Sequence, residues 1–172
     1  MYRSVTGEII WAYGEKEKAL LTINTPKYQA AAGRLDKVRV QLDNISAAFD
    51  QHGAITAIAL DDMTLSMSKS ILLTTVSSFR NTGMISEIRN SGPAHLQGKL
   101  VREVGTAPVL LKRIRGELVF TSAHNNIPRV AAVMTDGSLK NINGVQSKAG
   151  DKMQNIVIPL GTENSPWYWV EF

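Results

Sequence analysis

The histidines are the first side chains to consider for metal binding or general-base catalysis. The chain has only three, His52, His95 and His124, and their spacing matches neither an H-x-x-x-H nor an H-E-x-x-H pair. The sequence also lacks a G-x-S-x-G elbow, a Walker loop and a G-x-G-x-x-G turn. With no cysteine, thiolate nucleophiles, thiolate zinc sites and disulfides are excluded. The sequence therefore predicts no catalytic residue and a protein that is not itself an enzyme.

Paired carboxylates could hydrolyse a glycosidic bond, and the sequence contains the pair Asp61-Asp62 after a strand-like run. Neighbouring residues of an extended chain point to opposite sides, so these two carboxylates cannot flank one bond. Aspartates at a strand end more often shape a turn by hydrogen bonding to the backbone. A structural calcium ion held by Asp61 or Asp62 with loop carbonyls is the alternative, and no other cofactor is expected.

Tryptophan and tyrosine residues gather at the two ends of the chain. Trp11 and Tyr13 share one side of an alternating segment near the N-terminus, and Trp167 and Trp169 share one side of the last segment. The other side of that last segment is a continuous apolar set, Tyr168, Val170 and Phe172. We therefore expect this set to face the core and the two indoles to lie outside, next to Glu171.

Exposed aromatic rings are typical of binding surfaces. Sugar rings can stack on indole and phenol rings while nearby polar groups bond their hydroxyls. The candidate carbohydrate-binding residues are Trp11, Tyr13, Tyr28, Trp167 and Trp169. The alternative is that these rings cover the edge of the core or pack against a neighbouring domain.

Strand patterns must position these rings. Residues 38–42 and 113–120 alternate between apolar and polar positions, and along residues 9–13 the side chains of Ile9, Trp11 and Tyr13 alternate with those of Ile10 and Ala12. Residues 70–76 are rich in Ile, Leu, Thr and Val, which is typical of a fully buried strand. Asp136-Gly137 between two such runs predicts a hairpin. These patterns predict an all-β fold, an antiparallel β-sandwich or jelly roll of about ten to twelve short strands, as one domain over residues 1–172. Residues 87–105 are expected to form one long surface loop.

Composition is that of a globular protein. The chain has 172 residues, of which 44% are hydrophobic and 20% charged, with a net charge of +4. The basic residues are spread along the chain, which argues against nucleic acid as a partner. No apolar run approaches the ~20 residues of a membrane helix, and Met1-Tyr2-Arg3-Ser4 leads into a polar stretch rather than a signal peptide.

Three stretches carry a resemblance to a known family. They are residues 24–33 (Asn-Thr-Pro-Lys-Tyr-Gln, then Gly33), residues 59–84 (with Ser-Lys-Ser-Ile-Leu-Leu-Thr and Asn-Thr-Gly-Met), and residues 107–118 with the closing Trp167-Tyr168. Together they resemble the non-catalytic C-terminal β-sandwich region of large bacterial glycoside hydrolases of the cellulase- or agarase-like kind, a carbohydrate-binding-module-like region. The resemblance spans about residues 9–172, and the segments around Ser68 and Asn81 are its most specific part.

The resemblance implies an extracellular or cell-surface setting and polysaccharide degradation. It also implies two partners, a polysaccharide or oligosaccharide and the TIM-barrel catalytic domain of a parent enzyme. Asp62 stands where the similar sequences have a turn glycine, and Asn24 stands where they often have aspartate. Both departures weigh against a carboxylate mechanism here.

Three function classes stay open at this point. The leading expectation is a non-catalytic carbohydrate-binding module that keeps an enzyme near its polysaccharide by stacking and hydrogen bonds. The second is a structural accessory domain that packs on the catalytic barrel and stabilises it without binding sugar. The third is a free-standing jelly-roll lyase or hydrolase, for which the sequence offers no spacing that assembles an acid, a base and a cation.

Overall fold

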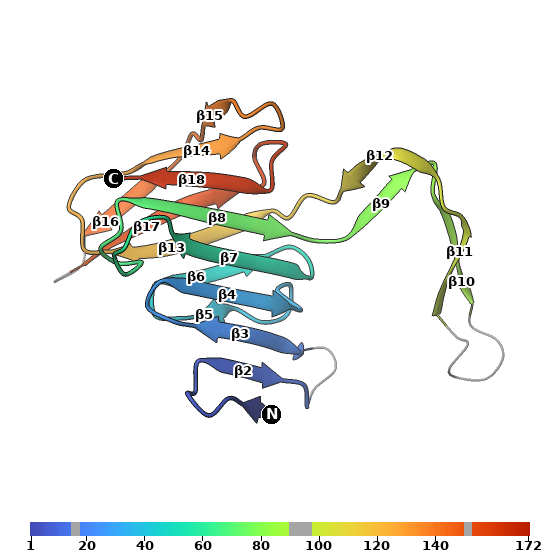
Figure 1. Cartoon of the computed structure of the whole chain (residues 1–172), viewed down its shortest axis with the longest axis horizontal. Coiled ribbons are helices and arrows are strands. Elements are labelled where there is room, and N and C mark those ends of the chain that lie inside the picture. The colour runs from blue at the N-terminus through green and yellow to red at the C-terminus, as the bar shows by residue number, and fades with distance from the viewer. Residues whose placement is uncertain (15–17, 90–97, 150–152) are drawn as a thin grey trace. The chain divides into compact units, whose positions relative to one another are not determined.

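The structure is a computed structural model that describes residues 1–14, 18–89, 98–149 and 153–172. The described residues contain strands and turns but no α-helix (Figure 1). They form two compact units, Met1–Ser77 with Arg113–Phe172, and Ser78–Lys112. The all-β prediction is confirmed, whereas the prediction of one domain over residues 1–172 stays a prediction.

A nine-stranded antiparallel sheet dominates the first unit. Its strands, in sheet order, are β1 (Tyr2–Arg3), β2 (Ile9–Ala12), β3 (Leu20–Asn24), β4 (Tyr28–Gly33), β7 (Gly53–Ala59), β8 (Ser70–Val76), β18 (Trp167–Glu171), β14 (Arg129–Val133) and β15 (Leu139–Asn141). The last strand of the chain thus lies between β8 and β14 (Figure 1). The hairpin predicted at Asp136-Gly137 is confirmed, because it joins β14 to β15 with Gly137 at φ 82°.

A five-stranded sheet forms the second layer of this unit. Its strands, in sheet order, are β16 (Gln146–Ala149), β17 (Gln154–Leu160), β13 (Gly116–Ser122), β6 (Ile45–Phe49) and β5 (Val40–Gln41). Buried side chains from both sheets, among them Leu73 and Tyr168 from one and Leu118 and Ile156 from the other, belong to one apolar cluster. Two sheets that enclose a shared core are consistent with a β-sandwich.

Alternation along the strands decides which side chains enter that core. The row across β4, β7, β8, β18 and β14 that faces the second layer consists of Gln29, Ala57, Leu73, Tyr168 and Ala132, all of them buried. The prediction that Tyr168 and Val170 face the core is confirmed, since they are 0% and 1% exposed. Phe172 is only partly buried but packs against the same cluster.

One buried polar network links the two layers. The Gln29 amide nitrogen donates to Asn44 Oδ1 at 3.1 Å, and the Asn44 backbone N–H donates to Gln29 Oε1 at 3.0 Å. The Asn44 side chain then donates to the backbone carbonyl of Thr121 on β13 at 3.1 Å. The side-chain amides of Gln29 and Asn44 are therefore both paired, and their hydrogen bonds tie β4 to the second sheet.

The second unit, Ser78–Lys112, consists of two strand pairs. β9 (Phe79–Thr82) pairs with β12 (Thr106–Leu111), and β10 (Ile85–Arg89) pairs with β11 (Gly98–Glu103). The prediction of one long loop over residues 87–105 is wrong where the structure describes it, because residues 87–89 belong to β10 and residues 98–103 to β11. All residues of β11 and most of β10 are exposed, so neither face of this strand pair needs to be apolar. The two strands therefore lack the alternation of apolar and polar residues that would identify them in the sequence.

Candidate functional site: the outer face of the nine-stranded sheet

The face of the nine-stranded sheet that points away from the second layer is built from three rows of aligned residues. The first row comprises Tyr2, Trp11, Leu21, Ala32, Ala54 and Val76. The second comprises Ile9, Ile23, Ala30, Thr56, Thr74 and Trp167. The third comprises Tyr28, Ile58, Leu72, Trp169 and Ala131, and it ends at the polar Asn141 on β15. We call these three rows the outer face.

The outer face is apolar and partly open. None of its members carries a charge, and its only aliphatic alcohols are Thr56 and Thr74. Trp11 is 51% exposed, Trp167 41% and Ile58 37%. An antiparallel sheet with one face in water normally alternates between apolar and polar residues, whereas strands that are buried on both faces are apolar throughout. The composition of the outer face is therefore that of a buried surface.

A polar row borders the outer face. Ser70, Glu171 and Arg129 are aligned across β8, β18 and β14. Arg129 lies 3.8 Å from the Glu171 carboxylate and donates to Asn141 Oδ1 at 3.0 Å. The change from uncharged rows to an ion-paired row marks where the apolar surface ends.

Trp167 and Trp169 lie on the outer face, as the sequence predicted. Trp169 is half-buried, and its indole N–H donates to the Ser70 hydroxyl at 2.8 Å. That bond fixes one edge of the ring against β8. Trp167 is the more exposed of the two and offers more open ring surface.

Trp11 and Tyr13 form a second aromatic group. Their ring centroids are 5.2 Å apart with an interplanar angle of 60°, an edge-to-face contact, and Tyr13 is 50% exposed. Tyr13 follows the end of β2, so its ring adjoins the first row without belonging to it. This pair presents a broad aromatic surface near one border of the sheet.

The five predicted carbohydrate-binding residues thus lie on or beside one face, but not in one cluster. Tyr28 and Trp169 share the third row, separated by Ile58 and Leu72. At the usual strand spacing, three steps across the sheet amount to about 14 Å. Five steps separate Trp11 on β2 from Trp167 on β18, about 24 Å. Aliphatic side chains fill the intervening surface.

Sequence reasoning missed those aliphatic members, in particular Ile9, Leu21, Ile23, Ile58 and Leu72. A signal for them was present in runs such as Ile9-Ile10-Trp11 and Ile71-Leu72-Leu73, which place apolar side chains on both sides of a strand. Full burial was predicted for residues 70–76 on that pattern. The structure instead buries Ile71, Leu73 and Thr75 and leaves the alternate positions half-buried or exposed.

Asp61 and Asp62 lie in the turn that follows β7. Asp61 accepts hydrogen bonds from the backbone N–H groups of Lys69 at 2.9 Å and Met63 at 3.2 Å, and the bond from Lys69 is the main cause of its lowered pKa. Asp62 lies 3.4 Å from the Lys27 ammonium. Both carboxylates therefore have partners, and a calcium ion at this turn stays a prediction.

The histidines do not form a common site in the described part of the chain. His124 Nε2 lies 3.1 Å from the carbonyls of Met67 and Ser68, and its ring stacks on Phe172, whereas His52 is exposed in a turn. His95 lies outside the described residues. No group of three or more His, Asp or Glu suited to a metal ion occurs within residues 1–14, 18–89, 98–149 and 153–172.

A search of the described residues finds no helix of the length and apolarity that crossing a membrane requires. Comparison with protein-family models, with curated proteins and with solved structures gives no match for this chain.

Proposed function

We propose that this chain is a non-catalytic accessory module that docks through its outer face on an apolar surface of a neighbouring protein domain. The observation that carries this proposal is the absence of charge from three adjacent rows that run across most of the nine-stranded sheet. Isolated apolar side chains on a surface are ordinary, whereas a contiguous apolar patch is typical of an interaction site.

The residual exposure of the two tryptophans sets the scale of the interaction. An aromatic side chain buries about 150–250 Å², and apolar burial contributes about 25 cal/mol per Å². With Trp11 51% and Trp167 41% exposed, covering each ring completely would contribute about 2 kcal/mol. That is the contribution expected of a residue at the centre of a protein interface.

The aliphatic residues favour a protein over a glycan as the occupant. Ile58 and Leu72 lie between the aromatic groups, and they offer no hydrogen bond to a sugar hydroxyl. A protein domain can cover the whole face with its own apolar side chains. This function corresponds to the second of the three classes that the sequence left open, an accessory domain that packs on a catalytic barrel.

Hydroxyl-radical footprinting tests the proposal. The protein isolated from its natural source is compared with the isolated chain of residues 1–172. We expect Trp11, Tyr13 and Trp167 to be oxidised more slowly in the natural protein, because the partner covers them. Met63, which is 47% exposed in a turn, serves as the accessible control, and Tyr168 as the buried one. Equal oxidation of the three rings in both samples would contradict docking through this face.

Glycan binding is the second candidate, favoured by the Trp11–Tyr13 pair. Both rings are about half exposed and in edge-to-face contact, so a sugar could stack on either. Calorimetry against neutral glucan, xylan and galactan oligosaccharides tests this candidate, with Trp11→Ala as the variant and Met63→Ala, an exposed side chain in a turn, as the control. Binding that Trp11→Ala abolishes and Met63→Ala retains would establish it, and a lack of heat with every glycan would reject it.

A further inference from the structure

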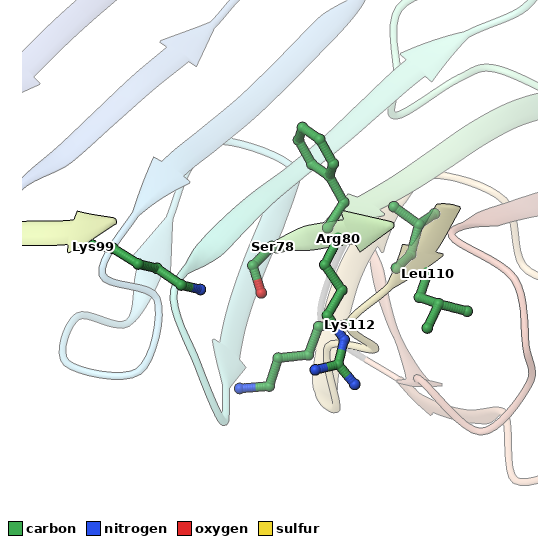
Figure 2. A pocket seen from close by; sticks show the side chains of 7 residues that line it. Ser78, Arg80, Lys99, Leu110 and Lys112 are labelled. Atoms are coloured by element: carbon green, nitrogen blue, oxygen red, sulfur yellow. The ribbon is translucent and has the colours of Figure 1, made fainter. Parts of the chain in front are cut away.

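The second unit contains a hollow whose polar lining is almost entirely cationic. The hollow has a volume of about 460 Å³ and is lined by Ser78, Phe79, Arg80, Lys99, Leu110, Leu111 and Lys112 (Figure 2). Pockets of about 300–1,000 Å³ hold small-molecule ligands. All of these residues belong to the unit Ser78–Lys112.

Strand register brings the polar groups to one side of the β9–β12 pair. Arg80 is aligned with Leu110, and the Lys112 backbone N–H donates to the Ser78 carbonyl at 2.8 Å, which continues the pairing by one step. Since alternate residues share a face, Ser78, Arg80, Leu110 and Lys112 lie on the same side. Figure 2 shows Arg80 and Lys112 extending in a common direction from the two strands.

Lys99 adds a third cation from β11. Its side chain reaches towards Ser78 in Figure 2. Phe79 and Leu111, which are aligned with each other, occupy the opposite side of the β9–β12 pair. The hollow is therefore lined by three cationic side chains, one hydroxyl and the apolar side chains of Phe79, Leu110 and Leu111.

These cations have no acidic partner among the residues that the structure describes. The acidic side chains of this unit are Glu87 and Glu103, and Glu87 is paired with Arg102 instead. Residues 78–112 hold five basic and two acidic side chains, so this segment accounts for +3 of the net charge of +4. Like charges gathered around one hollow repel each other, and an anion that enters it relieves this repulsion.

We propose that this hollow binds an oxyanion-bearing saccharide, a sugar that carries a carboxylate or a sulfate ester. Arg80 and Lys112 bind the oxyanion with charge-assisted hydrogen bonds, and Lys99 binds it from the other side. The Ser78 hydroxyl bonds a sugar hydroxyl, and Leu110 contacts the C–H face of the ring. Single-stranded nucleic acid fits less well, because it stacks successive bases on several aromatic rings, whereas Phe79 is the single aromatic side chain among the lining residues. The proposal is independent of docking through the outer face.

Calorimetry with the whole chain tests this site. The probes are an oligogalacturonate, a sulfated chondroitin oligosaccharide, a neutral oligosaccharide of equal length, inorganic sulfate and a single-stranded DNA oligonucleotide. We expect one or both acidic oligosaccharides to bind, the neutral one not to bind, and inorganic sulfate to bind more weakly than the acidic oligosaccharide. The two acidic probes distinguish a carboxylate from a sulfate ester as the group recognised.

The variants are Arg80→Gln, Lys99→Gln and Lys112→Gln, and the matched control is Arg89→Gln, an exposed arginine of the same unit that does not line the hollow. Each of the first three should weaken binding about 10-fold, because each removes a charge-assisted hydrogen bond, and the control should leave it unchanged. All four side chains are exposed, so the melting temperatures should match that of the parent chain.

Four results would overturn the proposal. The first is that neither acidic oligosaccharide binds at millimolar concentration, and the second is that Arg89→Gln loses as much affinity as the other variants. The third is that inorganic sulfate binds as tightly as the acidic oligosaccharides. The fourth is that DNA binds more tightly than both oligosaccharides and depends in the same way on Arg80, Lys99 and Lys112. The last result would assign the hollow to nucleic acid.

Discussion

Leu72 and Leu73 are neighbours on β8 that face opposite sides of the nine-stranded sheet, so the pair Leu72→Ala and Leu73→Ala tests whether the outer face is bare in the isolated chain. Leu73 is 0% exposed and belongs to the core cluster, so its truncation leaves a cavity and should cost about 2–5 kcal/mol of unfolding free energy. Leu72 is half-buried, so its truncation loses only part of the ~1.5–3 kcal/mol for complete burial, and water fills the space. We expect a cost of about 1 kcal/mol for Leu72→Ala.

Urea unfolding followed by far-ultraviolet circular dichroism measures both costs. The midpoint should fall several times further for Leu73→Ala than for Leu72→Ala, with the slope unchanged. An equal loss in the two variants would refute the inference that the outer face is open, since Leu72 would then be as well covered as a core residue. Repeating the experiment at several protein concentrations tests whether a second copy of the chain covers the outer face, because self-association makes the unfolding midpoint depend on protein concentration.

Three further predictions concern the first unit. Tyr168→Phe should cost about 1–3 kcal/mol in urea unfolding, because the buried hydroxyl accepts the Gly161 backbone N–H at 2.9 Å. Burial raises the pKa of Tyr168, so the folded protein favours the neutral side chain. The free energy of unfolding of the parent chain should therefore fall above about pH 10, where Tyr168 ionises in the unfolded chain. Tyr168→Phe should not show this fall in stability. Hydrogen bonds from Arg34 hold the pKa of Asp36 at about 2. The ionised Asp36 side chain therefore stabilises the fold fully above about pH 4, and this stabilisation is lost as the pH falls towards 2. Acid unfolding of Asp36→Asn should lack this loss. Both Gly161 and Gly137 have φ near 80°, but of these two only Gly161 would place a Cβ against a backbone carbonyl. Thermal melts should therefore show Gly161→Ala unfolded at a temperature where Gly137→Ala is folded.

The sequence predicts those parts of the fold that depend on local pattern. The side of the last strand that faces the core followed from the alternation of Tyr168 and Val170 with the two tryptophans, and the β14–β15 hairpin followed from Asp136-Gly137. In both cases the deciding signal lies within a few residues, either as a period of two or as a turn that needs positive φ.

The arrangement of the strands could not be predicted in this way. β18 pairs with β8 and β14, which are far from it in the sequence, and no local pattern specifies those partners. β10 and β11 escaped because they expose residues on both faces. The outer face escaped for the opposite reason: its apolar residues are interleaved with core residues, so the run of residues 70–76 predicted one fully buried strand. The pairing register of the strands in the structure was needed to tell the outer-face residues from the core residues.

The place of β18 has a consequence for how the chain folds. Trp167–Glu171 fills the gap between β8 and β14, and it supplies Tyr168 and Val170 to the core. Until those residues have left the ribosome tunnel, the nine-stranded sheet is divided into a piece with β8 at its margin and a separate β14–β15 hairpin. Completion of the sheet therefore waits for β18 and relies on long-range pairing, which is slow. Removing residues 167–172 would delete a strand from the middle of the nine-stranded sheet.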